Sequence, residues 1–437
     1  MPHTKPLPFQ KETVHKLETD FGGRGLIALD MGLGKTITSC AFLWKDQICR
    51  LPALVVCPAA VKYHWLREAK THFGLSSEII DGRSPYKLLE KDLTIINFEL
   101  LPYWQHALAK YPFSSMVVDE AQRLTNPTTK RTASTNIIQK EIPYLLATTG
   151  TPIENRPIDI FPIINMIKQE EFPSKFKFGL RYCQAKKGSN GKWDYRGSAN
   201  LLELNERLTS HLMVRKRLQD VIKDMPPKTT SVIPLEINQK EYRRCSDDFQ
   251  SWVRQEKGAG AVIRMKKAEA MIKIGTLLRL TSELKQASCI KWIEDFLQDT
   301  AEKIVVFGFH KERMLNPLFN HFQKKACIIT GDIPTHKREA IIREFKNDKE
   351  KRILFASIGA VGTGVDGLQE VAHHAAFVEL TWKPSEVEQA KRRLWRLKQK
   401  EKVFFDYLVA VNTIEERLAQ ALKKKQKVRD TAIDGIE

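Results

Sequence analysis

The chain has 437 residues, and its 71 lysine and arginine residues against 52 aspartate and glutamate residues give a formal net charge of +19. This length is too great for one hydrophobic core and favours two domains, while the positive charge favours nucleic acid as a partner over a merely basic surface. The seven cysteines lack the close Cys or His spacing of a zinc site or a disulfide framework, which excludes a small disulfide-rich secreted fold.

The ends and apolar runs of the chain bear on its location. The N-terminus reads Met-Pro-His-Thr-Lys-Pro and has no hydrophobic signal core. The longest apolar runs, such as Ile304–Phe309, are too short to span a bilayer. We therefore expect an intracellular protein, cytoplasmic or in the nucleoid or nucleus, without membrane attachment.

The first predicted strand, Leu26–Leu29, leads into a loop and a helix that suit a nucleoside triphosphate. Gly32 and Gly34 let backbone N–H groups close around phosphate oxygens, and the helix that follows directs its positive N-terminus at them. Lys35 would reach the β and γ oxygens, and the Thr36 hydroxyl would bind Mg²⁺. A leucine stands where the full pattern has its first glycine, so this motif alone is a modest signal.

A pair of carboxylates supplies the second half of the predicted site. The apolar run Met116–Val118 ends in Asp119 and Glu120. An isolated acid pair is more often a solvated loop, but after a glycine loop in an alternating β/α pattern it indicates hydrolysis of a phosphoanhydride. Asp119 would hold the Mg²⁺ shell, and Glu120 would act on the attacking water as general base. The two motifs together predict an ATPase site that uses ATP and Mg²⁺.

Short apolar runs alternate with helical patterns in two parts of the chain. We expect these runs to be buried on both faces, and with helices between them they predict parallel sheets in an α/β fold. The first series comprises Leu26–Leu29, Ala53–Cys57, Leu93–Ile96, Met116–Asp119 and Leu145–Thr149. The second comprises Ile304–Phe307, Cys327–Ile329, Ile353–Ala356, Ala375–Val378 and Phe404–Leu408.

Residues 157–300, between the two series, show helical patterns and few strand signals. The predicted helices of the chain include 36–44, Leu201–Leu218, Gln239–Lys257 and 413–427. The paired prolines of Met225–Lys228 predict a linker. We therefore predict two tandem lobes, 1–225 with a helical insertion over about 157–225, and 226–437 with a leading helical region over about 235–300.

Two arginines are the strongest functional candidates of the second lobe. Arg393 and Arg396 are three positions apart, so a helix would place both on one face. Their fork-shaped, permanent charge suits a transferring γ-phosphoryl group, whereas the bland alternative is a basic surface helix. The glycine loop Gly359–Gly364 and the basic run Lys423–Lys427 are weaker signals for phosphate contact.

Taken together, the motifs resemble the Swi/Snf group of superfamily-two helicase-like ATPases, from about Pro8 to Arg417. The resemblance implies two tandem RecA-like lobes with helical insertions and a C-terminal brace helix. It assigns nucleotide binding to Gln10, which would read adenine, and to Met31, Gly32, Leu33, Gly34, Lys35 and Thr36. It assigns coupling of hydrolysis to nucleic acid to Gly150, Thr151 and Gln389.

The middle segment carries a closer likeness. Phe178–Cys183 and Trp193–Leu201 are similar to the annealing-helicase branch, whose members rewind DNA and remodel stalled forks. The chain departs from the family pattern at Gln122 and Trp395, where histidine is usual, at Lys398, where glycine is usual, and at Asp366, where asparagine or threonine is usual. None of these departures removes a group that hydrolysis needs.

Family members follow the phosphate backbone across both lobes without reading base edges. The resemblance therefore proposes DNA contacts at Lys62, Arg181, Lys311, Thr363 and Trp382.

The sequence predicts an ATP-dependent translocase on double-stranded DNA, with an ATPase that DNA stimulates and with remodelling or annealing of forked DNA as an extension. Two alternatives stay open: a strand-separating DNA or RNA helicase, and a nucleic-acid-binding scaffold with a regulatory nucleotide site. We expect a monomer whose partner is double-stranded or forked DNA. The sequence does not identify single-strand-binding, replication or repair proteins as partners.

Overall fold

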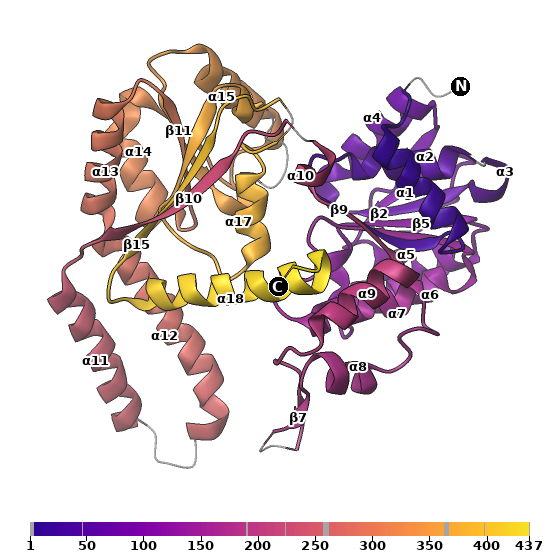
Figure 1. The fold of residues 1–437 in the computed structure, drawn as a ribbon, viewed down its shortest axis with the longest axis horizontal. Helices are drawn as coiled ribbons and strands as arrows, with labels where there is room; N and C mark the ends of the chain where they lie inside the picture. The colour runs from indigo at the N-terminus through magenta and orange to yellow at the C-terminus, as the bar shows by residue number, and fades with distance from the viewer. Residues whose placement is uncertain are drawn as a thin grey trace. The chain divides into compact units, whose positions relative to one another are not determined.

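The computed structural model describes residues 4–45, 47–188, 191–222, 224–256, 262–361, 367–396 and 398–436. Its contacts divide the chain into two compact units, one of residues 1–223 with 425–437 and the other of residues 224–424. We call these units the first and the second lobe. Each is built on a parallel sheet flanked by helices (Figure 1), which confirms the predicted fold class.

The first lobe contains, among the described residues, a seven-stranded parallel sheet in the order β3-β4-β2-β5-β6-β1-β9. The five predicted strands are confirmed close to their predicted bounds. The strands are β1 (Arg24–Leu29), β2 (Ala53–Cys57), β3 (Ser77–Ile79), β4 (Leu93–Asn97), β5 (Ser115–Asp119), β6 (Tyr144–Thr148) and β9 (Met213–Lys216).

Helices cover both faces of this sheet, which explains why its central strands β1, β2, β4, β5 and β6 are almost entirely buried. Leu26 and Ala28 join a core that includes Trp104 of α5, while Ile27 and Leu29, which alternate with them, are equally buried. The helices of the first lobe are α1 (Pro8–Thr19), α2 (Lys35–Lys45), α3 (Gln47–Arg50), α4 (Lys62–Phe73), α5 (Leu101–Lys110), α6 (Lys130–Ile138), α7 (Phe161–Ile167), α8 (Lys175–Tyr182), α9 (Leu201–His211) and α10 (Leu218–Val221).

The second lobe has, in the part of the chain described, a six-stranded parallel sheet in the order β10-β15-β14-β11-β13-β12. All five predicted strands are confirmed. The strands are β10 (Lys228–Leu235), β11 (Lys303–Gly308), β12 (Ala326–Ile329), β13 (Ile353–Ser357), β14 (Ala372–Phe377) and β15 (Val403–Ala410). The helices are α11 (Gln239–Glu256), α12 (Val262–Leu284), α13 (Gln286–Asp299), α14 (Asn316–Phe322), α15 (Thr335–Asn347), α16 (Ile358–Val361), α17 (Pro384–Lys391) and α18 (Ile414–Asp434).

Two edge strands correct the prediction that residues 157–300 are helical. The predicted helix Leu201–Leu218 ends at His211, and β9 then pairs with β1, Met213 opposite Leu26. Strand β10 lies at the edge of the second sheet, where Pro234 is tolerated because a proline can occupy an edge. Both strands were missed because their patterns differ from a doubly buried strand: β9 is short, and β10 is largely exposed.

A small antiparallel hairpin, β7 (Lys186–Lys187) with β8 (Trp193–Asp194), leaves the first lobe between α8 and α9 (Figure 1). None of the helices that the structure describes is long and apolar enough to cross a membrane.

Candidate functional site

The predicted phosphate loop joins β1 to α2 in a conformation that requires its glycines. Gly32 and Gly34 have φ values of +88° and +71°, in the left-handed region that side chains other than glycine seldom adopt. A Cβ on Gly34 would also lie 2.7 Å from Nε2 of Gln10. That nitrogen donates to the carbonyl of Leu33 at 3.2 Å. Gln10, predicted to read adenine, therefore lies buried against the loop.

Lys35 is the first residue of α2, and its ammonium lies at the carboxyl end of β1. The Nζ donates to the carbonyl of Leu29 at 3.3 Å. A Cβ on Gly150 would lie 3.4 Å from that Nζ and 3.1 Å from Cγ of Met31. The predicted coupling residue Gly150 therefore packs against the phosphate loop, where even a methyl group would crowd it.

The predicted metal ligand, Asp119, ends β5 and is held by three donors. Its Oδ2 accepts from the Trp65 indole at 2.9 Å, and its Oδ1 accepts from the Thr148 hydroxyl at 2.7 Å and from the Glu120 amide at 3.0 Å. An ionised carboxylate has about four acceptor positions, so the contacts present leave room for a water of a metal shell. The sequence interpretation did not include Trp65 or Thr148.

Glu120 is connected by hydrogen bonds to the predicted coupling motif. The Gln122 amide donates to Oε2 of Glu120 at 2.6 Å and accepts from the Thr149 hydroxyl at 2.6 Å. That hydroxyl accepts in turn from the Thr151 amide at 3.0 Å. A glutamine can donate and accept at once, so Gln122, a departure from the family pattern, completes a continuous chain of contacts from the predicted base to Thr151.

The surroundings of Glu120 favour its neutral form. Burial raises the pKa of the Glu120 carboxyl, and the neighbouring Asp119 raises it further, while Lys35 opposes both effects. Its backbone has φ of +53°, unusual for a residue with a side chain. Strained backbone and a raised pKa at a strand end are typical of catalytic positions.

A buried group of ion pairs holds Asp30, the residue that precedes the glycines of the phosphate loop. Arg215 of β9 contacts Oδ1 of Asp30 at 2.9 Å and Oδ1 of Asp434, near the end of α18, at 2.6 Å. Its Nη1 also donates to the carbonyl of Ala28 at 3.0 Å, and the second oxygen of Asp30 accepts from the Leu218 amide at 3.0 Å. The last turns of α18 are thereby fixed to the residue that opens the phosphate loop.

The other end of α18 is held in the same way within the second lobe. The fully buried Lys285 donates to both oxygens of Glu415, at 2.6 and 2.7 Å, and to the carbonyl of Leu408 at 3.1 Å. Oε2 of Glu415 also accepts from the Ala410 amide at 3.0 Å. The carboxylate and the ammonium therefore have the partners that burial requires.

Arg393 and Arg396 do not lie on a helix, which corrects the prediction that a helical face aligns them. Helix α17 ends at Lys391, and both arginines lie in the turns that follow. The buried indole of Trp395 donates to the carbonyl of Pro226 at 2.8 Å, while the buried amide of Gln399 donates to the carbonyl of Leu394 at 3.2 Å. These contacts draw the chain out of the helix. Gln389 is half-buried on α17.

The predicted DNA contacts have varied surroundings. Lys62 is buried and pairs with Asp81. Arg181 forms a two-point contact with Glu203, and Lys311 contacts Asp332 at 2.5 Å. Thr363 lies outside the described residues, as do the rest of residues 362–364, the second half of the glycine loop Gly359–Gly364, and Asp366. Their roles stay predictions, and the partners of the three cations reduce their availability for phosphate.

Trp382 is 38% exposed and borders a cavity of about 590 Å³ in the second lobe. At its wall, the buried Glu379 accepts from Nδ1 of His310 at 2.7 Å, from the Phe309 amide at 2.6 Å and from the Ser282 hydroxyl. Burial alone would raise the pKa of Glu379, but its hydrogen bonds from His310 and Ser282 outweigh burial and lower that pKa. The lowered pKa favours the ionised form of Glu379, and its hydrogen bonds fix the carboxylate in the wall of the cavity.

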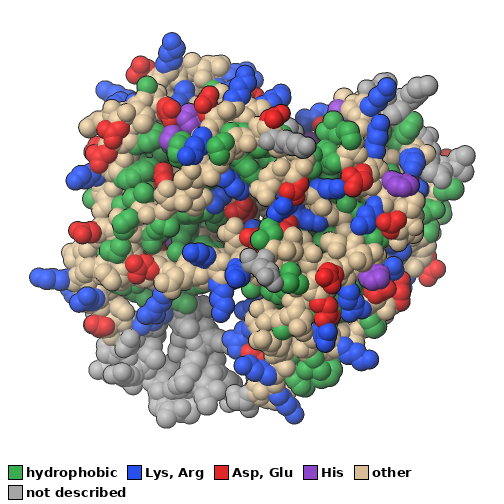
Figure 2. Space-filling view, in the orientation of Figure 1, with side chains coloured by type: hydrophobic (Ala, Val, Ile, Leu, Met, Phe, Trp, Pro, Cys, Tyr) green, Lys and Arg blue, Asp and Glu red, His purple; other side chains and the backbone are tan. Residues whose placement is uncertain are grey.

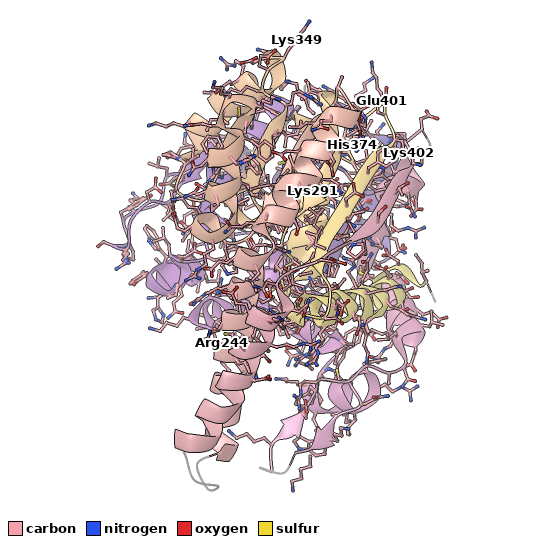
Figure 3. All side chains as sticks on the ribbon, turned by 90° about the vertical axis from the view of Figure 1, so that its left-hand side faces the viewer. Arg244, Lys291, Lys349, His374, Glu401 and Lys402 are labelled. Atoms are coloured by element: carbon pink, nitrogen blue, oxygen red, sulfur yellow. The ribbon has the colours of Figure 1, made fainter. Side chains whose placement is uncertain are left out.

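A group that could hold a metal lies elsewhere in the second lobe. Oε2 of Glu302 is 2.8 Å from Nε2 of His373 and 2.7 Å from Nε2 of His374. A shift in register between β11 and β14 lets two consecutive histidines reach one carboxylate. His374 stacks on the Phe404 ring, and the Lys402 ammonium lies 5.1 Å from the centroid of the same ring. Figure 3 labels His374 and Lys402 in the second lobe. The group lies at the amino ends of β11 and β14 in the sheet of the second lobe.

Comparison with known proteins places both lobes in described families. The SNF2-related domain matches residues 11–291, and the helicase conserved C-terminal domain matches residues 285–398. The mouse protein "DNA annealing helicase and endonuclease ZRANB3" is 28% identical over 99% of this chain and 41% of its own length. The Caenorhabditis elegans homolog of "SWI/SNF-related matrix-associated actin-dependent regulator of chromatin subfamily A-like protein 1" is 28% identical over 96% of this chain and 60% of its own length.

Among solved structures, the "Sulfolobus solfataricus SWI2/SNF2 ATPase core in complex with dsDNA" aligns with 98% of this chain and 93% of its own, at 21% identity and a TM-score of 0.48. The chain spans about two-fifths of the length of the mouse relative.

Proposed function

The chain belongs to the SNF2-related family, and from that premise we propose that it is a DNA-stimulated ATPase that moves along double-stranded DNA. The observation that carries the proposal is the bonded chain in the first lobe that runs from Glu120 through Gln122 to Thr149 and Thr151. It gives the predicted catalytic base a direct physical connection to the motif that the family resemblance assigns to coupling.

The residues of the first lobe fit a magnesium nucleotide. The phosphate loop offers backbone N–H groups and Lys35 to the phosphates, and the predicted metal ligands, Thr36 and Asp119, are oxygen donors of the kind Mg²⁺ prefers. When bound, Mg²⁺ neutralises charge on the phosphate oxygens. Glu120 orients the water and takes its proton, which requires the carboxylate to be ionised.

Arg393 and Arg396 are proposed to complete the site from the second lobe. A guanidinium group that meets the transferring phosphoryl stabilises the charge spread over its oxygens. Binding of ATP would then favour a closed arrangement of the lobes and hydrolysis an open one, and alternating grip on one strand would produce stepping. Remodelling or annealing of forked DNA is the extension that the likeness to annealing helicases suggests.

The proposal is tested by steady-state ATPase rates with single-stranded, blunt duplex and forked DNA and with RNA, at one fixed salt concentration because binding to a polyanion falls steeply with salt. We expect duplex and forked DNA to stimulate hydrolysis more than single strands. Stronger stimulation by single strands or RNA would favour a strand-separating helicase. Nucleotide binding without hydrolysis under all conditions would favour a regulatory scaffold.

A further inference from the structure

Three large apolar side chains are exposed together on α8 and β8 of the first lobe. Phe176, Leu180 and Trp193 are 42%, 47% and 41% exposed. The rings of Phe176 and Trp193 meet edge to face, with centroids 4.8 Å apart. Apolar rings in contact normally lie in a core, so their exposure here leaves ring surface available to a ligand. We call these three residues, with Lys186 and Lys187 of β7, the hairpin platform.

The backbone beneath the platform is firmly fixed. A Cβ on Gly179 would lie 2.2 Å from the Tyr195 ring, so the helix and the hairpin pack closely there. The Ala185 amide donates to the carbonyl of Gly179 at 3.1 Å, and the Ala199 amide donates to that of Tyr182 at 2.9 Å. The platform is therefore held in position before any ligand binds, which reduces the entropy lost on binding.

Side chains at the base add to this rigidity. Glu203 of α9 accepts from Arg181 at two points and from the Tyr182 hydroxyl at 2.8 Å. Arg181, predicted to touch DNA, thus has a positioning role in the folded chain. The residues Phe178–Cys183 and Trp193–Leu201, which carry the likeness to annealing helicases, are the ones that build this base.

Charge around the platform is strongly positive. The exposed lysines on α8 and the hairpin are Lys175, Lys177, Lys186, Lys187 and Lys192. The nearby acids Asp194 and Glu203 are paired with Arg196 and Arg181. Figure 2 shows Lys and Arg side chains beside hydrophobic ones where α8 and β7 lie. Exposed rings bordered by lysines are the combination that binds bases by stacking and phosphates by charge.

We infer that the hairpin platform binds an unpaired DNA base beside a duplex, and so selects forked over blunt DNA. Within an intact duplex each base face is covered by its neighbours, so the rings of Phe176 and Trp193 gain a stacking partner where pairing ends. Lys186 and Lys187 would contact the phosphates of the strand that bears the base. This inference rests on the proposed function and names its substrate more closely.

The test compares the full chain with F176A/W193A by fluorescence anisotropy on forked, single-stranded and blunt duplex DNA of equal length, without nucleotide and at fixed salt. We expect the wild type to prefer the fork and the variant to lose about tenfold or more in fork affinity, with less than twofold change on blunt duplex. Because both rings are exposed, the variant should retain its fold, which its thermal unfolding checks.

Two controls accompany this test. Y103A removes an exposed aromatic ring of α5 in the same lobe and should bind all three DNAs as the wild type does. K186E/K187E should weaken binding to forked and single-stranded DNA and lower the salt dependence, while K110E/K140E, a matched charge change on exposed residues of this lobe, should change binding less.

The outcomes separate the inference from the proposed function. If the wild type shows DNA-stimulated ATPase but F176A/W193A keeps its fork affinity, or loses blunt duplex equally, the inference is overturned and the function stands. A wild type without preference for the fork overturns it as well. If the wild type binds none of the DNAs, the proposed function fails and the inference fails with it.

Discussion

The two lobes share a parallel α/β plan but fix their predicted catalytic side chains by different means. In the first lobe, Asp119 and Glu120 end a central strand, and side chains from neighbouring strands and loops bond to them directly. In the second lobe, Arg393 and Arg396 lie in turns that one indole and one amide hold in shape. The side chains proposed for the first lobe are thus held by the sheet itself, whereas those proposed for the second lobe depend on a few anchoring contacts outside its sheet.

The largest expected effect is on kcat and comes from substitution of Arg393 and Arg396, the two arginines proposed for the site. Arg393→Ala and Arg396→Ala should each lower the kcat of DNA-stimulated hydrolysis by about 10³-fold or more, because a guanidinium group at a transferring phosphoryl supplies that much. Phosphate release at saturating ATP and duplex DNA measures it. Arg343→Ala, an exposed change on α15, is the control. A loss of less than tenfold in both variants would remove the arginines from the proposed site.

Substitution of Glu120 in the first lobe should lower kcat nearly as much as substitution of the arginines. Glu120→Gln should lower kcat by about 10²–10⁴-fold, because an amide cannot take the proton of the attacking water. DNA binding should persist, since the change leaves the basic surfaces intact, and anisotropy checks this. Lys35→Ala should likewise abolish turnover. Wild-type hydrolysis by either variant would refute the assignment of the nucleotide site.

The ion-pair group under the phosphate loop predicts a change in stability. Arg215→Ala leaves Asp30 and Asp434 buried without their cation, and should lower the free energy of unfolding of the first lobe by about 3–5 kcal/mol. Denaturant titration measures this. The neighbouring Lys216→Ala removes an ion pair with the exposed Glu12 and should cost less than about 1 kcal/mol. Equal losses of unfolding free energy in the two variants would show that the buried ion pairs contribute no more to stability than the exposed one.

The bonded chain from Glu120 to Thr151 predicts an effect on coupling. Gln122→Ala interrupts the contacts to Glu120 and Thr149. We expect it to reduce the ratio of DNA-stimulated to basal ATPase rate several-fold, with a smaller change in the basal rate. Gln122→His restores the residue usual in the resembled family and should recover much of the ratio. If the basal rate falls as much as the stimulated rate, Gln122 positions Glu120 but has no separate role in coupling.

The smallest expected effect is a shift in pH dependence. Because burial and Asp119 raise the pKa of Glu120, the ionised base is lost at a higher pH than for an ordinary glutamate. The acidic limb of the kcat/KM profile should therefore lie above the range near 4.3 that is usual for glutamate, with activity falling as the pH drops through the raised pKa. A limb at the usual value would show that the pKa of Glu120 is not raised in the free enzyme, because the kcat/KM profile reports the free enzyme.

Much of the fold was predictable because its signals are local. Most residues of the ten predicted strands are apolar on both faces, a pattern typical of a parallel sheet that helices cover on both sides. The order of the motifs also identified the family that the domain matches then showed. Edge strand β9 was missed because it is short and its last two residues, Arg215 and Lys216, are charged, and β10 was missed because it is largely exposed.

The sequence suggested the residue types of the proposed site but not their contacts. Lys35, Asp119 and Glu120 could be selected because their chemistry and spacing follow a pattern. The bonds of Trp65 and Thr148 to Asp119 join residues 54 and 29 positions apart, and no local pattern marks them. The sequence likewise indicated a helix through Arg393 and Arg396, while distant partners, Pro226 among them, determined that the helix ends earlier.

The sequence by itself determined the two α/β lobes, the phosphate loop and the acid pair, because burial periodicity and glycine geometry are properties of short segments. The tertiary structure alone decided which side chains meet. Arg215 and Asp434 are 219 positions apart, yet their contact fixes the end of α18 beneath the phosphate loop. A buried charge needs a partner of opposite charge. Which residue becomes that partner depends on the order of the strands in the sheet, which brings together residues that are far apart in the sequence.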